Sequence, residues 1–232
     1  HVLRLALAES TLLVGQHDDA MEVYARLLHE ATSLANRTPV LVHMLRAHTM
    51  LGDVSVGHRV QQQALRLARD VMQEAGVDLR SHRGWRDLWE RARHRRRRAR
   101  LMNNLQHRPT ASAAQLGGVQ KVLGGCLELA MHVDPSLVEV LTRELVRMAV
   151  DEGATPATGL ALLVEALLQR RHDPFSSEDL LHQGLQLAID DDAWGATAEY
   201  LAACHNVVLD AEKGDRGFAS AAEHAERDAN WD

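Results

Sequence analysis

The segment from Arg91 to Arg100 is the part of the chain whose residue types and spacing point most directly to chemistry. Its ten positions hold seven arginines, namely Arg91, Arg93, Arg95, Arg96, Arg97, Arg98 and Arg100. Guanidinium groups stay charged and bind carboxylates and phosphates through paired hydrogen bonds. The segment is therefore a candidate interaction patch for an acidic protein surface or for nucleic-acid phosphates. A third interpretation is a protruding helix whose arginines lie in water or pair with the acidic C-terminus, because charge runs are usually solvated.

A helix that begins near Trp85 must carry these arginines. Its apolar positions are Trp85, Leu88, Trp89, Ala92, Ala99 and Met102. Arg95 and Arg96 interrupt this stripe, so the spacing predicts arginines on every side of the helix. A helix with one buried face would need acidic partners to tolerate them.

Acidic residues gather at the other end of the chain. From Asp190 onward there are eleven acidic residues and three basic ones, and the whole chain has a formal charge of −6. This distribution predicts a salt-sensitive contact between the arginine segment and the acidic region, in the same molecule or in a second copy. The acidic balance and the lack of a recognition-helix motif make nucleic acid the less favoured partner.

The sequence contains no recognisable catalytic motif. It has no Gly-rich loop ending in Lys-Ser or Lys-Thr, and no kinase His-Arg-Asp or Asp-Phe-Gly motif. The doublets Gly117-Gly118 and Gly124-Gly125 fall within helical patterns and are interpreted as close-packing points. We therefore predict no enzyme activity, no catalytic residue and no cofactor in this chain.

The fourteen histidines raise the question of a metal site. None shows the paired spacing of a zinc helix, and His43 and His48 do not share a helix face. His94 stands among arginines, which oppose a bound cation. We predict no metal site and interpret the histidines as surface residues.

Composition predicts a folded, all-α, cytoplasmic protein. Hydrophobic residues make up 46% of the chain and aromatic residues 3%, and the excess of Ala and Leu over β-branched residues disfavours a sheet. Cys126 and Cys204 stand in apolar helical stretches, as buried free thiols do. No apolar run is long enough to span a membrane, and no secretory leader is apparent.

Helix punctuation predicts stacked antiparallel helix pairs. Helical runs break at Gly15 and at Gly52-Asp53, which are 37 residues apart, and Gly214-Asp215 repeats the Gly-Asp sequence. We interpret all three as repeat turns of a TPR-like superhelical solenoid with about eleven helices. The only clear internal linker predicts an N-terminal lobe over 1–105, a linker over 106–115 and a C-terminal lobe over 116–232.

Several helix boundaries carry strong start and stop residues. Asp134-Pro135 and Thr155-Pro156 each place Pro at the first helical position, and Gly153 ends the helix between them. Asp173-Pro174 is followed by Ser176, with Asp179 three residues later, which predicts a capping-box-like start at Ser176.

These boundaries also support a resemblance to a known family. The stretch MHVDPSLVEVLTRELVRMAVDEGATPATGLALLVEALL, over 131–168, resembles the helical-repeat region of large bacterial signalling ATPases of the STAND class. RLALAESTLLVGQHDDAMEVYARLL, over 4–28, is similar to the first repeat of that region. In that family the region joins an AAA-like ATPase to GAF and histidine-kinase domains, often behind a serine/threonine kinase. Here the helix after Thr155-Pro156 lacks the aromatic residues usual in the family, and the linker is basic rather than acidic.

The resemblance implies a non-catalytic interaction or sensor module of a bacterial signal-transduction protein. Such a module binds a protein, a small effector or other domains of its parent, and relays that binding to an attached ATPase or kinase. The alternative is the helical-repeat part of a LuxR-type transcriptional regulator, in which residues 91–100 contact nucleic acid. A purely structural spacer is the third reading.

Overall fold

A computed structural model describes residues 2–50, 57–79, 85–104, 114–191, 194–207 and 211–229. Within these ranges the chain forms eleven α-helices and no strand, which confirms the all-α prediction. The helices are α1 (Val2–Leu13), α2 (His17–Glu30), α3 (Leu34–Met50), α4 (Gly57–Glu74), α5 (Trp85–Asn104), α6 (Ala114–Val133), α7 (Pro135–Glu152), α8 (Pro156–Gln169), α9 (Pro174–Ala188), α10 (Gly195–Asn206) and α11 (Ala211–Ala229). None of these described helices combines the length and apolar character needed to cross a membrane.

The helices belong to two compact units that interleave along the chain. The first unit contains His1–Ser81 and Ala113–Leu141, and the second contains His82–Ser112 and Thr142–Asp232. The helix α6 therefore belongs with α1–α4, and α5 belongs with the helices that follow α7. This division differs from the predicted lobes 1–105 and 116–232. Most of the predicted linker 106–115 lies outside the described residues.

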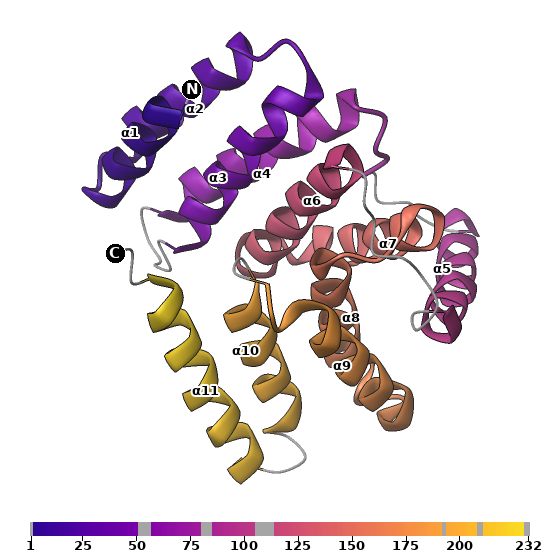
Figure 1. Ribbon diagram of the computed structural model, residues 1–232. Coiled ribbons are helices and arrows are strands. Elements are labelled where there is room, and N and C mark those ends of the chain that lie inside the picture. The colour runs from indigo at the N-terminus through magenta and orange to yellow at the C-terminus, as the bar shows by residue number, and fades with distance from the viewer. Residues whose placement is uncertain are drawn as a thin grey trace. The chain divides into compact units, whose positions relative to one another are not determined.

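The first unit is built from neighbouring helices with buried apolar stripes. α1 packs against α2, α3 packs against α4, and α6 packs against both α3 and α4 (Figure 1). Glycines allow α6 to come close to α3. A Cβ at Gly118 would lie 2.9 Å from Thr38 Cγ2, and one at Gly125 would lie 3.2 Å from Leu45 Cβ. The interpretation of these glycines as packing points is confirmed.

The second unit is organised around α8, which is buried on nearly every side. All residues from Ala157 to Ala166 are buried, as expected for a helix with an almost continuous apolar sequence. α8 packs against α9 and α10, and α11 lies along α10 (Figure 1). The one carboxylate in this buried run is Glu165, and its partners define the candidate site below.

Local turn chemistry explains most of the predicted helix ends. Gly15, Gly76 and Gly153 have φ values of 85°, 85° and 121°, a left-handed conformation that glycine adopts without steric cost. Gly15 is thus confirmed as a turn residue. The predicted repeat turn at Gly52-Asp53 lies outside the described residues.

The proline starts are confirmed, with one correction. α7, α8 and α9 begin at Pro135, Pro156 and Pro174. The N-cap of α9 is Asp173, whose side chain accepts a hydrogen bond from the backbone N–H of Ser176. The predicted cap at Ser176 is therefore wrong, because Pro174 already has helical geometry and Asp173 provides the acceptor that this helix start needs.

The prediction of a repeat turn at Gly214-Asp215 is wrong. Both residues lie inside α11, which begins at Ala211. Gly214 is buried, and a Cβ there would lie 2.6 Å from the Cα of Val207. The glycine serves close packing of α11 beside the end of α10, and the sequence alone does not separate this role from a turn.

Candidate functional site

The seven arginines of the candidate interaction patch all lie on α5. Arg91, Arg93, Arg95, Arg96 and Arg100 are exposed, and Arg97 and Arg98 are partly buried. Leu101 is the buried residue of this helix. The patch is therefore a helix surface with arginines on both its inward and its outward sides, as the spacing predicted.

The inner face of α5 is polar and is bound to α8. We define the inner face as Asp87, Glu90, His94, Arg98 and Leu101. Glu165 Oε1 accepts a hydrogen bond from Arg98 Nη1 at 2.6 Å and lies 3.0 Å from His94 Nε2. The side chains of Glu165 and Arg98 are only 7% and 17% exposed. This buried ion pair fixes the middle of α5 on the second unit.

Electrostatics keeps Glu165 ionised in this buried position. Burial alone would raise the pKa of its carboxyl group, but the hydrogen bonds and charges of His94 and Arg98 outweigh burial and lower it. Gln169 Nε2 donates a further hydrogen bond to Glu165 Oε1 at 2.8 Å. The carboxylate is thus a charged anchor.

A second anchor lies near the start of α5. The carboxylate of Asp87 accepts hydrogen bonds from Arg143 Nη1 of α7 at 3.2 Å and from Arg91 Nε at 2.9 Å. Glu90 pairs with Arg93 at 3.2 Å. Asp87, Glu90 and Glu165 are thus acidic partners of arginines on α5, and none of the three belongs to the acidic region from Asp190 onward.

The outer face of α5 carries the apolar residues. We define it as Trp85, Leu88, Trp89, Ala92, Arg96 and Ala99, which lie on the side opposite the inner face because a helix has 3.6 residues per turn. Trp85, Leu88 and Trp89 are 85%, 59% and 65% exposed. Arg93 lies over the Trp89 ring, 5.0 Å from its centroid. The apolar stripe found in the sequence thus faces outward, and charged residues occupy the inward side.

Two histidines contradict the interpretation of the histidines as surface residues. His48 and His205 are 0% and 1% exposed. His48 Nε2 lies 2.9 Å from Met21 Sδ, and burial, followed by the nearby His17, lowers the pKa of His48 to about 4. Burial is also the main cause that lowers the pKa of His205. Both rings are therefore neutral core residues near neutral pH.

The buried state of His48 predicts a loss of stability in acid. The unfolded chain protonates His48 below its ordinary pKa of 6.5, whereas the folded chain resists protonation down to about 4. Stability is therefore complete above the ordinary pKa and falls as the pH drops toward the lowered one, by about 3 kcal/mol in total. Urea unfolding near pH 7 and near pH 4.5 measures this loss.

The matched comparison for this prediction is between His48→Gln and His43→Gln. His43 is a half-exposed residue that pairs with Glu9 at 2.8 Å. We expect His48→Gln to reduce the acid sensitivity and His43→Gln to leave it nearly unchanged. Equal acid sensitivity in the wild type and in His48→Gln would contradict the assignment.

Ser177 and His205 form a close serine–histidine pair, but their geometry is structural. Ser177 Oγ lies 2.5 Å from His205 Nε2 and donates to the carbonyl oxygen of Ala166 at 2.8 Å. Both side chains are buried, with Ser177 0% and His205 1% exposed. A nucleophile–base pair needs an accessible hydroxyl and an oriented base. This pair instead connects α8, α9 and α10.

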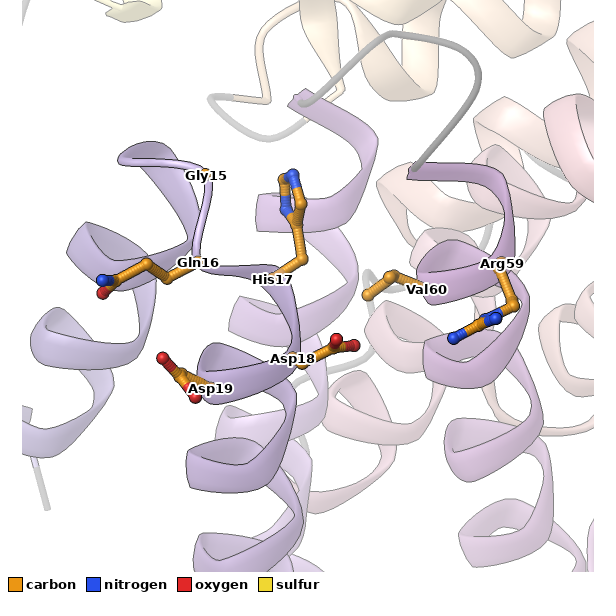
Figure 2. Close-up of a pocket in the computed structure, with 7 residues that line it drawn as sticks. All are labelled: Gly15, Gln16, His17, Asp18, Asp19, Arg59 and Val60. Atoms are coloured by element: carbon orange, nitrogen blue, oxygen red, sulfur yellow. The ribbon is translucent and has the colours of Figure 1, made fainter.

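A hollow of about 580 Å³ lies between the start of α2 and the start of α4 in the first unit. It is lined by Gly15, Gln16, His17, Asp18, Asp19, Arg59 and Val60 (Figure 2). Figure 2 shows Asp18 directed toward α4, whereas Gln16 and Asp19 point to the other side of α2. Ligand sites usually gather convergent polar groups over an apolar lining. Because Gln16 and Asp19 point away from this hollow, its polar groups do not converge, and it does not identify an effector.

The described part of the chain contains no cluster of metal ligands, and its two cysteines are not paired. No group of three or more His, Cys, Asp or Glu residues there could hold a metal ion. Cys126 and Cys204 are free thiols, and burial raises the pKa of Cys126 to about 12. Cys126 therefore packs as an apolar core residue.

Sequence reasoning missed Glu165, the residue that anchors the candidate site. The available signal was a single carboxylate within the apolar run Leu160–Leu168, because a charge in a buried helix needs a partner. The identity of that partner is not visible in the sequence, since His94 and Arg98 precede Glu165 by 71 and 67 residues. No family model, curated protein or solved structure matches the chain.

Proposed function

We propose that this chain is a non-catalytic interaction module that binds a partner protein through α5. The observation that carries the proposal is the orientation of α5. Its polar inner face is anchored through Glu165, while Trp85, Leu88 and Trp89 are exposed. Exposed aromatic residues beside arginines are typical of protein-binding surfaces.

The wider setting of this module is also part of the proposal. Its resemblance to STAND-class signalling ATPases favours a cytoplasmic bacterial signal-transduction protein that relays binding to attached ATPase or kinase domains. The glycine turn at Gly15 and the packing of α1–α2 and α3–α4 as neighbouring pairs support a TPR-like solenoid in the first unit. A small effector remains a second ligand class within this proposal.

Site-specific photo-crosslinking in cells that make this chain tests the proposal. A photoreactive phenylalanine analogue replaces Leu88 on the outer face, and in a control it replaces the exposed Ala222 of α11. We expect a recurring protein adduct at position 88 that is absent at position 222. The proposal fails if position 88 gives no protein adduct, or if both positions give the same adducts.

A second candidate function has its own supporting observation. Arg95, Arg96 and Arg100 are exposed, and such arginines on a helix can neutralise phosphates. This favours the LuxR-type alternative, in which α5 contacts nucleic acid. Adducts of nucleic acid rather than protein at position 88 would support it.

A further inference from the structure

We propose that the outer face of α5 docks an acidic amphipathic helix of the partner protein. This inference rests on the proposed function of α5 and specifies the chemistry of what it binds. It is carried by the spacing of the apolar residues, by the sign of the charges that border them, and by the contact between Arg93 and Trp89.

The apolar residues have the spacing of a helix-packing seam. Trp85, Leu88, Trp89 and Ala92 occupy positions i, i+3, i+4 and i+7, so they form one continuous stripe over the first turns of α5. All four are exposed. A second helix with its own apolar stripe can place side chains between these residues, whereas an extended segment finds no free backbone groups on a helix surface.

The charges around the seam have a single sign. Arg93 and Arg100 border it on one side, and Arg91 and Arg95 border it on the other, as the helical period requires. The acidic residues of α5, Asp87 and Glu90, belong to the inner face and are already paired. Arginines flanking a helical seam on both sides select carboxylates at the flanking positions of the partner and oppose a basic helix.

Three arginines of α5 have charge available for a partner. Arg95, Arg96 and Arg100 are exposed, and no ion pair is found for them within the described residues. Arg96 lies on the outer face itself, in line with Trp85 and Trp89. A partner helix therefore needs an acidic residue opposite Arg96, in addition to acidic flanks.

The contact between Arg93 and Trp89 favours a helix over single-stranded nucleic acid. Proteins that bind single strands stack bases on open aromatic faces. The guanidinium of Arg93 covers one face of Trp89 at 5.0 Å from the ring centroid. Leu88 and Ala92 are exposed on the same stripe, and these aliphatic side chains match the side chains of a helix better than they match bases.

Fluorescence anisotropy with synthetic helical peptides tests this inference on the full chain. The probe is a labelled peptide of about three heptads with Leu at the seam positions and Glu at the flanking positions. Its matched control replaces every flanking Glu with Gln. We expect the Gln peptide to bind about tenfold more weakly, and the difference to shrink as salt is added.

Charge reversal on the protein gives the decisive comparison. Arg95→Glu/Arg96→Glu/Arg100→Glu is expected to abolish binding of the Glu peptide and to create binding of a peptide with Lys at the flanking positions. A control variant, Arg59→Glu/Arg66→Glu/Arg171→Glu, changes the net charge equally at exposed sites outside α5. It should bind the Glu peptide as the wild type does. Recovery with the Lys peptide also shows that the α5 variant is folded.

Three outcomes would overturn the inference. These are a wild type that does not bind the Glu peptide, binding that survives charge reversal on α5, and equal loss of binding in both reversal variants. A parallel titration uses a labelled single-stranded oligonucleotide. If the oligonucleotide binds and the Glu peptide does not, and the binding is lost in the α5 variant, the outer face binds nucleic acid. If position 88 gives a protein adduct but the Glu peptide does not bind, the partner is not an acidic helix. The proposed function of α5 as a protein-binding surface would then still stand.

Discussion

Replacing Glu165 by alanine is expected to destabilise the second unit by about 4 kcal/mol, because it leaves the partly buried Arg98 without its carboxylate. Arg98 Nη1 is 2.6 Å from Glu165 Oε1, and His94 and Gln169 contact the same oxygen atom. Urea unfolding measures the free energy, and hydrogen exchange measures the protection of α5 amides. We expect both to fall.

Two further variants separate the ion pair from general packing. Arg100→Ala removes an exposed arginine of the same helix and should change stability by less than about 0.5 kcal/mol. Glu165→Leu/Arg98→Leu replaces the buried pair with apolar residues and should recover much of the loss. If Glu165→Ala unfolds at the same urea concentration as the wild type, the anchor assigned to α5 is wrong.

The Glu165 pair also has a defined pH dependence. The pKa of Glu165 lies below its ordinary value of 4.5, so the folded chain holds the carboxylate ionised where the unfolded chain begins to protonate. The contribution of the pair is complete above that ordinary value and is lost as the pH falls through the lowered pKa. His48 acts over a different pH range. It destabilises the first unit as the pH falls from its ordinary pKa of 6.5 toward about 4.

The sequence predicts helix ends well where the signal is local. Gly15 and Gly153 have left-handed conformations, and Pro135 and Pro156 begin helices, because these residues act through their own backbone geometry. Gly214 shows the limit of this reasoning. A glycine in a helical pattern serves either as a turn or as a close-packing point, and only the neighbouring Val207 reveals which applies.

The orientation of α5 could not be predicted, because its partner lies far away in the sequence. Periodicity identifies the stripe of Trp85, Leu88 and Trp89, and burial of apolar surface usually turns such a stripe inward. Here the inward side is chosen by Glu165 and Arg143, which belong to α8 and α7. A buried carboxylate needs a charged partner, and the orientation of α5 that supplies this partner leaves exposed the residues that we assign to binding.

The second large effect is expected at the crossing of α8 and α9. A Cβ at Gly159 would lie 2.7 Å from the carbonyl oxygen of Gly184 and 2.9 Å from the Cβ atoms of Leu187 and Ala188. Because a backbone atom is in the way, the helices must separate to accept a side chain. We expect Gly159→Leu to cost about 4 kcal/mol and Gly159→Ala about 2 kcal/mol, even though alanine favours a helix.

The comparison at Gly125 makes this prediction specific to backbone contact. A Cβ at Gly125 would meet the side chain of Leu45 at 3.2 Å, and a leucine side chain can shift by a few tenths of an ångström. Gly125→Ala should therefore stay within about 1 kcal/mol of the wild type, since the gain in helix propensity offsets the strain. Thermal unfolding of all three variants measures these differences. Equal effects of alanine at Gly159 and at Gly125 would show that α8 and α9 yield at their crossing, and α8 would then be a less firm support for Glu165 and for α5.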